Sequence, residues 1–199
     1  MTRDFQEALD GISEIRSRIA LSTDFKGYGA ATVAASGLFA WAAAGLQGLV
    51  IVDPLERFPA FLLLWTGAAI LSVCLVGIEM AWRARRRHLR LTPDLIRAAW
   101  SQLLPAGLAG ALLTIILLPA APEIRALIPA LWQILFSLGL FASARFLSGR
   151  AQGAALWYLG AGLVNLGLAV AGAPLSPWTM GIPFGVGQLL LAAALRGSR

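Results

Sequence analysis

Six apolar stretches, separated by short polar connections, set the pattern of this chain. Each stretch is about 18–25 residues long, which is the length an α-helix needs to cross a hydrocarbon core about 30 Å thick. The predicted spans are residues 28–52, 60–82, 98–118, 126–146, 153–173 and 178–195. The pattern therefore predicts an all-α polytopic membrane bundle of six transmembrane helices within residues 27–199.

The segment before the first span follows a different period. Its apolar side chains recur at three- and four-residue steps, and charged side chains occupy its other faces, which is typical of an amphipathic helix. The apolar positions are Phe5, Ala8, Leu9, Ile12, Ile15 and Ile19. We expect residues 1–26 to form a cytoplasmic helix that rests on the bundle, with residues 5–19 as an alternative surface for a second copy or a protein partner.

The basic residues are distributed very unevenly between the connections. Of the 16 Lys and Arg residues, only Arg57 and Arg125 fall on one side of the predicted membrane. Short loops rich in Lys and Arg stay in the cytoplasm. We therefore expect both termini and the 83–97 connection to be cytoplasmic.

Composition adds two exclusions to this picture. The chain is 58% hydrophobic and carries a formal net charge of +6. A basic chain can bind nucleic acid, but phosphate contacts need an accessible basic face, and here the retention of positive residues in short inner loops accounts for the excess. We expect the lipid bilayer as the surroundings and no nucleic-acid partner. The lone cysteine, Cys74, excludes an intrachain disulfide.

Residues that carry out catalysis or bind metals are scarce. The single histidine is His88 in the basic inner loop, and the single lysine is Lys26 at the membrane boundary. A multi-histidine metal site and a bis-histidine haem are therefore excluded, and no Walker, HExxH or GxSxG sequence occurs. We expect a protein that is not an enzyme and has no catalytic residue, metal or cofactor.

One carboxylate lies inside a predicted span. Glu79 is about one turn from the inner end of the second span, and Arg83 follows it at i+4, a spacing that stabilises an ion pair on a helix. We expect an interfacial ion pair between Glu79 and Arg83. The alternative is a proton or ion role, because ionisable residues within membranes are often functional.

Amides and tryptophans are the notable polar groups deep in the spans. An amide that faces lipid leaves its donors unsatisfied, so these residues are expected to face inward and meet one another. The set is Gln47, Trp65, Trp132, Gln133, Asn165 and Gln188. They form either hydrogen bonds between helices or a neutral ligand pocket that opens to the outside.

The sixth span carries a helix break beside these amides, made of Gly181, Pro183 and Gly185. Proline removes an i→i−4 hydrogen bond, and a freed carbonyl at membrane depth persists only where protein or water satisfies it. We therefore place the pocket in the outer half, beside the break, with Trp65 and Trp132 as its walls.

Several short motifs resemble a family of small six-span bacterial membrane proteins. The opening carries Glu14-Ile15-Arg16, then Ser22-Thr23 with Phe25, then Ala35-Ser36-Gly37. Tyr158-Leu159-Gly160 and Phe184-Gly185-Val186 match the last two spans. Relatives carry Glu and His in these spans, where this chain has Leu163 and Gln188. The resemblance, to an uncharacterised family with an N-terminal amphipathic segment, implies the fold and a bacterial inner membrane, and no substrate.

Three functions remain open at this point. The leading one is a non-enzymatic sensor or partner-binding membrane subunit, because charged machinery for coupling is absent from the spans. The alternative is a channel or facilitator for a small neutral or lipophilic solute, through an amide- and Trp-lined core. A lipid-binding protein is the weaker alternative. A pocket that opens to one side favours the sensor. A continuous polar path through the bundle favours the channel, and a lateral gap between spans favours the lipid-binding protein.

Overall fold

The computed structural model describes residues 29–86, 92–143 and 151–196, and this part of the chain is helical with no strand. The helices are α2 (Ala30–Val50), α3 (Phe58–Arg86), α4 (Thr92–Leu117), α5 (Pro122–Arg125), α6 (Ile128–Ser143), α7 (Ala151–Val170) and α8 (Trp178–Arg196). The expectation of an all-α chain is confirmed for these residues. The predicted helix over residues 1–26 lies outside the described residues.

Five of the described helical segments are long and apolar enough to cross a membrane. They are Ala30–Val50, Phe58–Trp82, Pro122–Ser143, Ala151–Val170 and Trp178–Arg196, and the third of them covers both α5 and α6. The described apolar part of α4, Leu103–Leu117, is shorter. Large apolar side chains such as Leu63, Ile70 and Val164 are exposed on the outside of the bundle, as lipid-facing positions should be.

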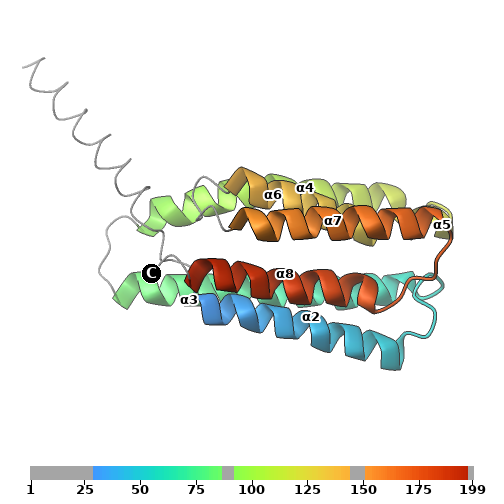
Figure 1. Cartoon of the computed structure of the whole chain (residues 1–199), viewed down its shortest axis with the longest axis horizontal. Coiled ribbons are helices and arrows are strands. Elements are labelled where there is room, and N and C mark those ends of the chain that lie inside the picture. Colours follow the sequence, from blue (N-terminus) through green and yellow to red (C-terminus); the bar gives the residue numbers. More distant parts are fainter. Residues whose placement is uncertain (1–28, 87–91, 144–150, 197–199) are drawn as a thin grey trace, which may run out of the picture.

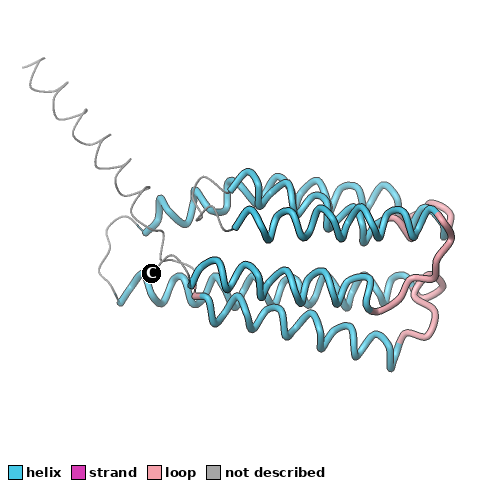
Figure 2. The backbone as a smooth tube through the Cα atoms, in the orientation of Figure 1, coloured by secondary structure: helices cyan, strands magenta, loops and turns pink. Residues whose placement is uncertain are grey.

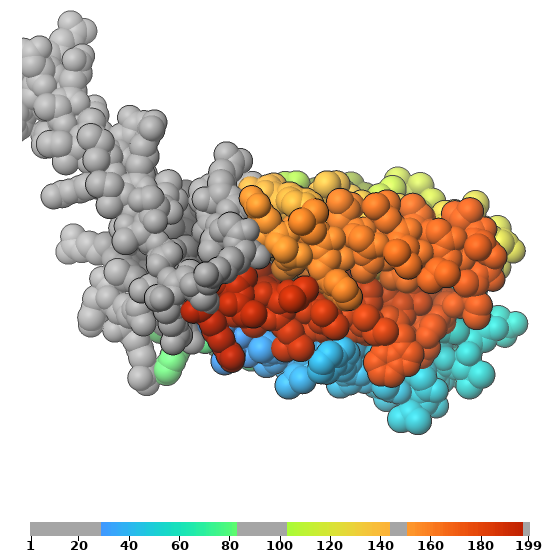
Figure 3. Space-filling model, viewed as in Figure 1, coloured from blue at the N-terminus to red at the C-terminus, as the bar shows by residue number. Residues whose placement is uncertain are grey.

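The long helices form two groups of three that lie along the same axis (Figures 1 and 2). In one group α2 contacts both α3 and α8, and in the other α6 contacts both α4 and α7. Contacts of α8 with α7 and α6 join the groups. On the face seen in Figure 3, α7 (orange) lies against α8 (red), with α2 (blue to cyan) beyond α8.

The connections that the structure describes lie together at one end of the bundle. The α2–α3 connection, the α5 segment and the α7–α8 connection share one end, and the C-terminal end of α8 lies at the other (Figure 1). Arg57 and Arg125 therefore lie at the end of the three described connections. The Arg125 guanidinium is stacked over the Phe58 ring there, 5.6 Å from the ring centroid.

Small residues let α2 and α8 pack closely along their length. A Cβ atom added to Gly181 would lie 2.6 Å from the Ala44 Cβ, and one added to Gly37 would lie 2.9 Å from the Gly185 carbonyl oxygen. The Trp41 indole occupies the space beside Gly185. This interface is the most extensive between any two described helices, and close backbone approach of this kind is how membrane helices associate.

Three aromatic rings fill the interior between α6, α7 and α8. The centroids of Phe136 and Tyr158 are 4.8 Å apart, those of Tyr158 and Phe184 are 5.3 Å apart, and those of Phe136 and Phe184 are 5.8 Å apart. Tyr158 is fully buried, and its ring rests against Gly187 of α8, which has no side chain to obstruct it. We call these three side chains the aromatic triad.

Candidate functional site

The proline in α8 and two of the predicted amides form one hydrogen-bonded network. Pro183 lies inside α8 and has no N–H, so the carbonyl of Thr179, four residues earlier, has no helical donor. Gln133 Nε2 donates to that carbonyl oxygen at 2.8 Å, and Asn165 Nδ2 donates to it at 3.0 Å. Side chains from α6 and α7 therefore satisfy the carbonyl that the proline frees in α8.

A further bond connects the two amides directly. Asn165 Nδ2 donates to Gln133 Oε1 at 2.9 Å, and the second interaction of Gln133 Nε2 is with the Met180 sulfur at 3.7 Å. The orientation of both amides follows from chemistry, because a backbone carbonyl only accepts and must face their nitrogens. Both N–H bonds of Asn165 are thus engaged, and Gln133 is fully buried. The break stays local, since α8 continues as one helix to Arg196.

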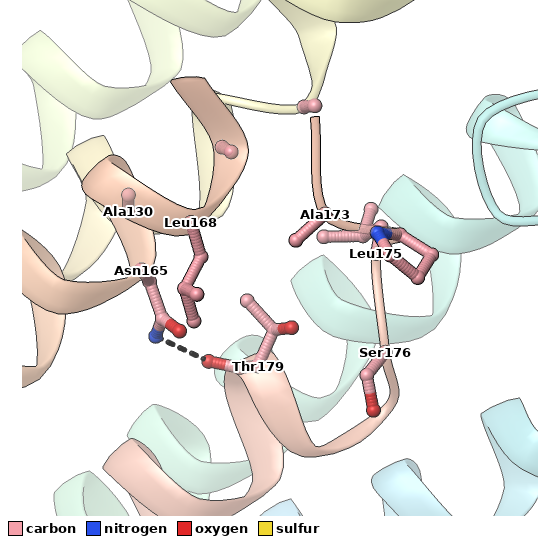
Figure 4. A pocket seen from close by; sticks show the side chains of 10 residues that line it. Ala130, Asn165, Leu168, Ala173, Leu175, Ser176 and Thr179 are labelled. Atoms are coloured by element: carbon pink, nitrogen blue, oxygen red, sulfur yellow. Dashed lines mark hydrogen bonds between the residues drawn. The ribbon is translucent and has the colours of Figure 1, made fainter. Parts of the chain in front are cut away.

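A cavity of about 100 Å³ adjoins this network at the end of the bundle that holds the α7–α8 connection (Figure 4). It is lined by Ala126, Ala130, Asn165, Leu168, Ala169, Ala173, Pro174, Leu175, Ser176 and Thr179. Asn165 belongs to both features: its amide group holds the Thr179 carbonyl and also lines the cavity (Figure 4). Trp65 and Trp132, predicted as walls of a pocket beside the break, are not among these lining residues.

Gln47 and Trp65 form a separate pair between α2 and α3. Trp65 Nε1 donates to Gln47 Oε1 at 2.7 Å, and Gln47 is fully buried. The indole N–H can only donate, so the oxygen of the amide must face it. Gln47 Nε2 is buried and has no hydrogen-bond partner among the described residues. Trp65 belongs to the cluster of Phe58, Phe61 and the small residues of α2.

The remaining two predicted residues, Trp132 and Gln188, lie apart from the network and from the Gln47–Trp65 pair. Trp132 Nε1 donates to Thr114 Oγ1 at 2.9 Å and so connects α6 to α4. Gln188 is half-buried, with its side chain beside the Tyr158 hydroxyl and its Cβ close to Gly37 of α2. The structure thus brings Gln133 and Asn165 together, pairs Gln47 with Trp65, and positions Trp132 and Gln188 at other helix contacts.

Glu79 lies at the opposite end of the bundle from the cavity. Its carboxylate rests against Gly29, where a Cβ atom would collide with both carboxylate oxygens. The Arg83 side chain lies outside the described part of the chain, so the proposed ion pair stays a prediction. In the described ranges, no group of three or more His, Cys, Asp or Glu side chains could hold a metal ion.

Sequence reasoning did not select Thr179, Ser176 or the chain around Ala173. A usable signal for Thr179 was present, since it lies four residues before Pro183 and its carbonyl must be the one that the proline frees. The other two lie in the connection that folds over the cavity, and no periodic pattern marks such positions. Comparisons with protein-family models, curated proteins and solved structures give no match to this chain.

Proposed function

We propose that this chain is a non-enzymatic sensor subunit of a bacterial inner membrane, which detects a small molecule at the outer end of its bundle. It crosses the membrane six times with both termini in the cytoplasm, as the distribution of Arg and Lys residues favours. One observation carries the sensing proposal: Asn165 lines the cavity and also holds the freed carbonyl of α8.

The network gives a bound molecule a route to the rest of the bundle. A ligand that contacts Asn165 or Thr179 changes the hydrogen bonds on the first turn of α8. That helix has its most extensive contact with α2, where Gly181 meets Ala44 and Gly185 meets Trp41. A shift of α8 therefore changes the position of α2, and we propose that this change alters a partner contact made by residues 5–19. The ligand can shift this equilibrium only by its differential affinity for the two states.

The aromatic triad argues against the channel alternative. Phe136, Tyr158 and Phe184 lie on α6, α7 and α8, the helices that supply the network, and each is further from the outer end than the network residue on its helix. The rings thus pack against one another between these helices, further from the outer end than the network. The cavity adjoins the α7–α8 connection, so it supports the one-sided binding of a sensor over lateral entry of a lipid.

The proposal is tested by filling the cavity and measuring movement at a distance. The full chain, with Cys74→Ala, carries nitroxide labels at Leu104 of α4 and Leu190 of α8, both exposed to lipid. Ala169→Leu places a larger side chain in the cavity. Ala171→Leu is the matched control, because Ala171 is exposed and does not line the cavity. Electron–electron double resonance in nanodiscs then gives the distribution of distances between the labels.

A sensor predicts a changed distribution for Ala169→Leu and an unchanged one for Ala171→Leu. The same distribution in both variants and the parent protein would contradict it. Stopped-flow light scattering of proteoliposomes tests the alternative directly, since a channel raises the flux of glycerol, urea or acetamide above that of protein-free liposomes. The sensor predicts no increase.

A further inference from the structure

The size of the cavity limits which molecules can occupy it, and this inference rests on the proposed function. Its volume is about 100 Å³. A dry cavity of about 150 Å³ in another protein is known to bind benzene, which has six carbon atoms. By proportion, a molecule of about four non-hydrogen atoms fills the present cavity.

The lining excludes charged molecules of that size. None of the ten lining residues is acidic or basic, and seven of them contribute only apolar side chains. Moving an ion from water into such surroundings without a partner of opposite charge is strongly unfavourable. A neutral molecule with an apolar body matches the methyl groups of Ala126, Ala130, Ala169 and Ala173.

The hydrogen bonds already formed in the network determine what the ligand must supply. Both N–H bonds of the Asn165 amide are engaged, and the Thr179 carbonyl already accepts two hydrogen bonds. The carbonyl oxygen of the Asn165 side chain remains, and it can only accept. The Ser176 and Thr179 hydroxyls line the same space and can either donate or accept (Figure 4).

We propose that the cavity binds a small uncharged molecule of about four non-hydrogen atoms that donates a hydrogen bond to Asn165 Oδ1. Short branched alcohols and small primary amides belong to this class. Their apolar groups lie against the alanines, and their O–H or N–H faces the asparagine. A molecule that only accepts hydrogen bonds can pair with the Ser176 or Thr179 hydroxyl but forms no bond with the Asn165 oxygen, so we expect it to bind less tightly.

A set of probes with one branched skeleton separates these requirements. 2-Propanol and acetamide donate a hydrogen bond, acetone only accepts, isobutane does neither, and acetate is charged. Saturation-transfer NMR with the full chain in nanodiscs, corrected with empty nanodiscs, gives their dissociation constants. We expect 2-propanol and acetamide to bind about three- to tenfold more tightly than acetone and isobutane, as one hydrogen bond provides, and acetate not to bind.

Substitutions in and beside the cavity locate the binding site. Ala169→Leu is expected to abolish the binding of both donors, while Ala171→Leu leaves it unchanged. Asn165→Leu is expected to remove the preference for donors over acetone, and its circular-dichroism spectrum establishes whether the bundle remains folded.

The outcomes separate this inference from the proposed function. Tighter binding of acetone or isobutane to the parent protein overturns the ligand class and leaves the sensing proposal standing. If no probe binds but Ala169→Leu changes the distance distribution, the ligand class is again overturned and the sensing proposal stands. Absence of binding together with an unchanged distribution overturns both.

Discussion

Replacing Gln133 tests whether the buried amides are required because of the proline in α8. Gln133→Leu nearly preserves the side-chain volume and removes the donor at 2.8 Å from the Thr179 carbonyl and the acceptor at 2.9 Å from Asn165 Nδ2. Each lost hydrogen bond costs about 1 kcal/mol, and a group left unsatisfied costs about 1–3 kcal/mol. We therefore expect the free energy of unfolding to fall by about 2–3 kcal/mol.

Gln133→Leu should lower the free energy of unfolding by a smaller amount when residue 183 has an N–H group. In Pro183→Ala, the new N–H can bond the Thr179 carbonyl within the helix, so that carbonyl no longer needs Gln133. We expect Gln133→Leu to cost about 1 kcal/mol less in that background. Reversible unfolding in mixed micelles, followed by ellipticity, provides all four free energies of the cycle.

Ser143→Ala serves as the control in both backgrounds. The Ser143 hydroxyl bonds the Gly139 carbonyl of its own helix at 2.8 Å, ten residues along α6 from Gln133 and so about 15 Å away. Its effect should be the same in the parent protein and in the Pro183→Ala variant, because distant sites are additive. An equal cost of Gln133→Leu in the two backgrounds would refute the link between the amides and the proline.

Three further predictions concern packing, topology and the N-terminal segment. Gly187→Ala should destabilise the bundle by about 1–3 kcal/mol, because its Cβ would lie 2.6 Å from the Tyr158 hydroxyl oxygen. Gly160 has open space around it, so Gly160→Ala should be neutral or stabilising in the same unfolding assay. In a Cys74→Ala chain, a cysteine at Ala121 should react with an impermeant thiol reagent from outside the cell and one at Ser148 should not; the reverse labelling would overturn the topology. Ile15→Asp should lower the melting temperature or dissociate an oligomer, since burial of such a side chain contributes about 1.5–3 kcal/mol. Thermal unfolding and light scattering measure the two effects. If neither changes, residues 5–19 are not a contact surface.

The helices were predictable because hydropathy and proline act locally along the chain. The expected span 178–195 and the observed α8, Trp178–Arg196, differ by one residue. Asn165 and Gln133 were selected for their depth, and depth follows from a rise of about 1.5 Å per residue. Pro183 also marked the helix that needed an external donor.

The neighbours of each amide were less predictable, because depth does not determine how a helix is rotated or which helices lie beside it. Gln47 and Gln133 both lie in the half of the bundle nearer the α7–α8 connection, yet Gln47 faces Trp65 of α3 and Gln133 faces α7 and α8. The residues at Gly181, Gly185 and Gly187 decide how closely α8 approaches α2 and α7. Such contacts depend on the shapes of both surfaces, which a single sequence does not align.

The pairing of α2 with α8 has a consequence for biogenesis. About 130 residues separate the end of α2 at Val50 from the start of α8 at Trp178, and a ribosome adds about 5–20 residues per second, so α2 waits roughly 6–25 s for its partner. During that interval its face of Gly37, Trp41 and Ala44 is without the α8 surface that later covers it. The nascent chain must therefore be held by lipid, by the insertion machinery or by a membrane chaperone until α8 emerges. A ribosome that stalls before Trp178 leaves a product whose uncovered α2 face quality-control proteases can recognise.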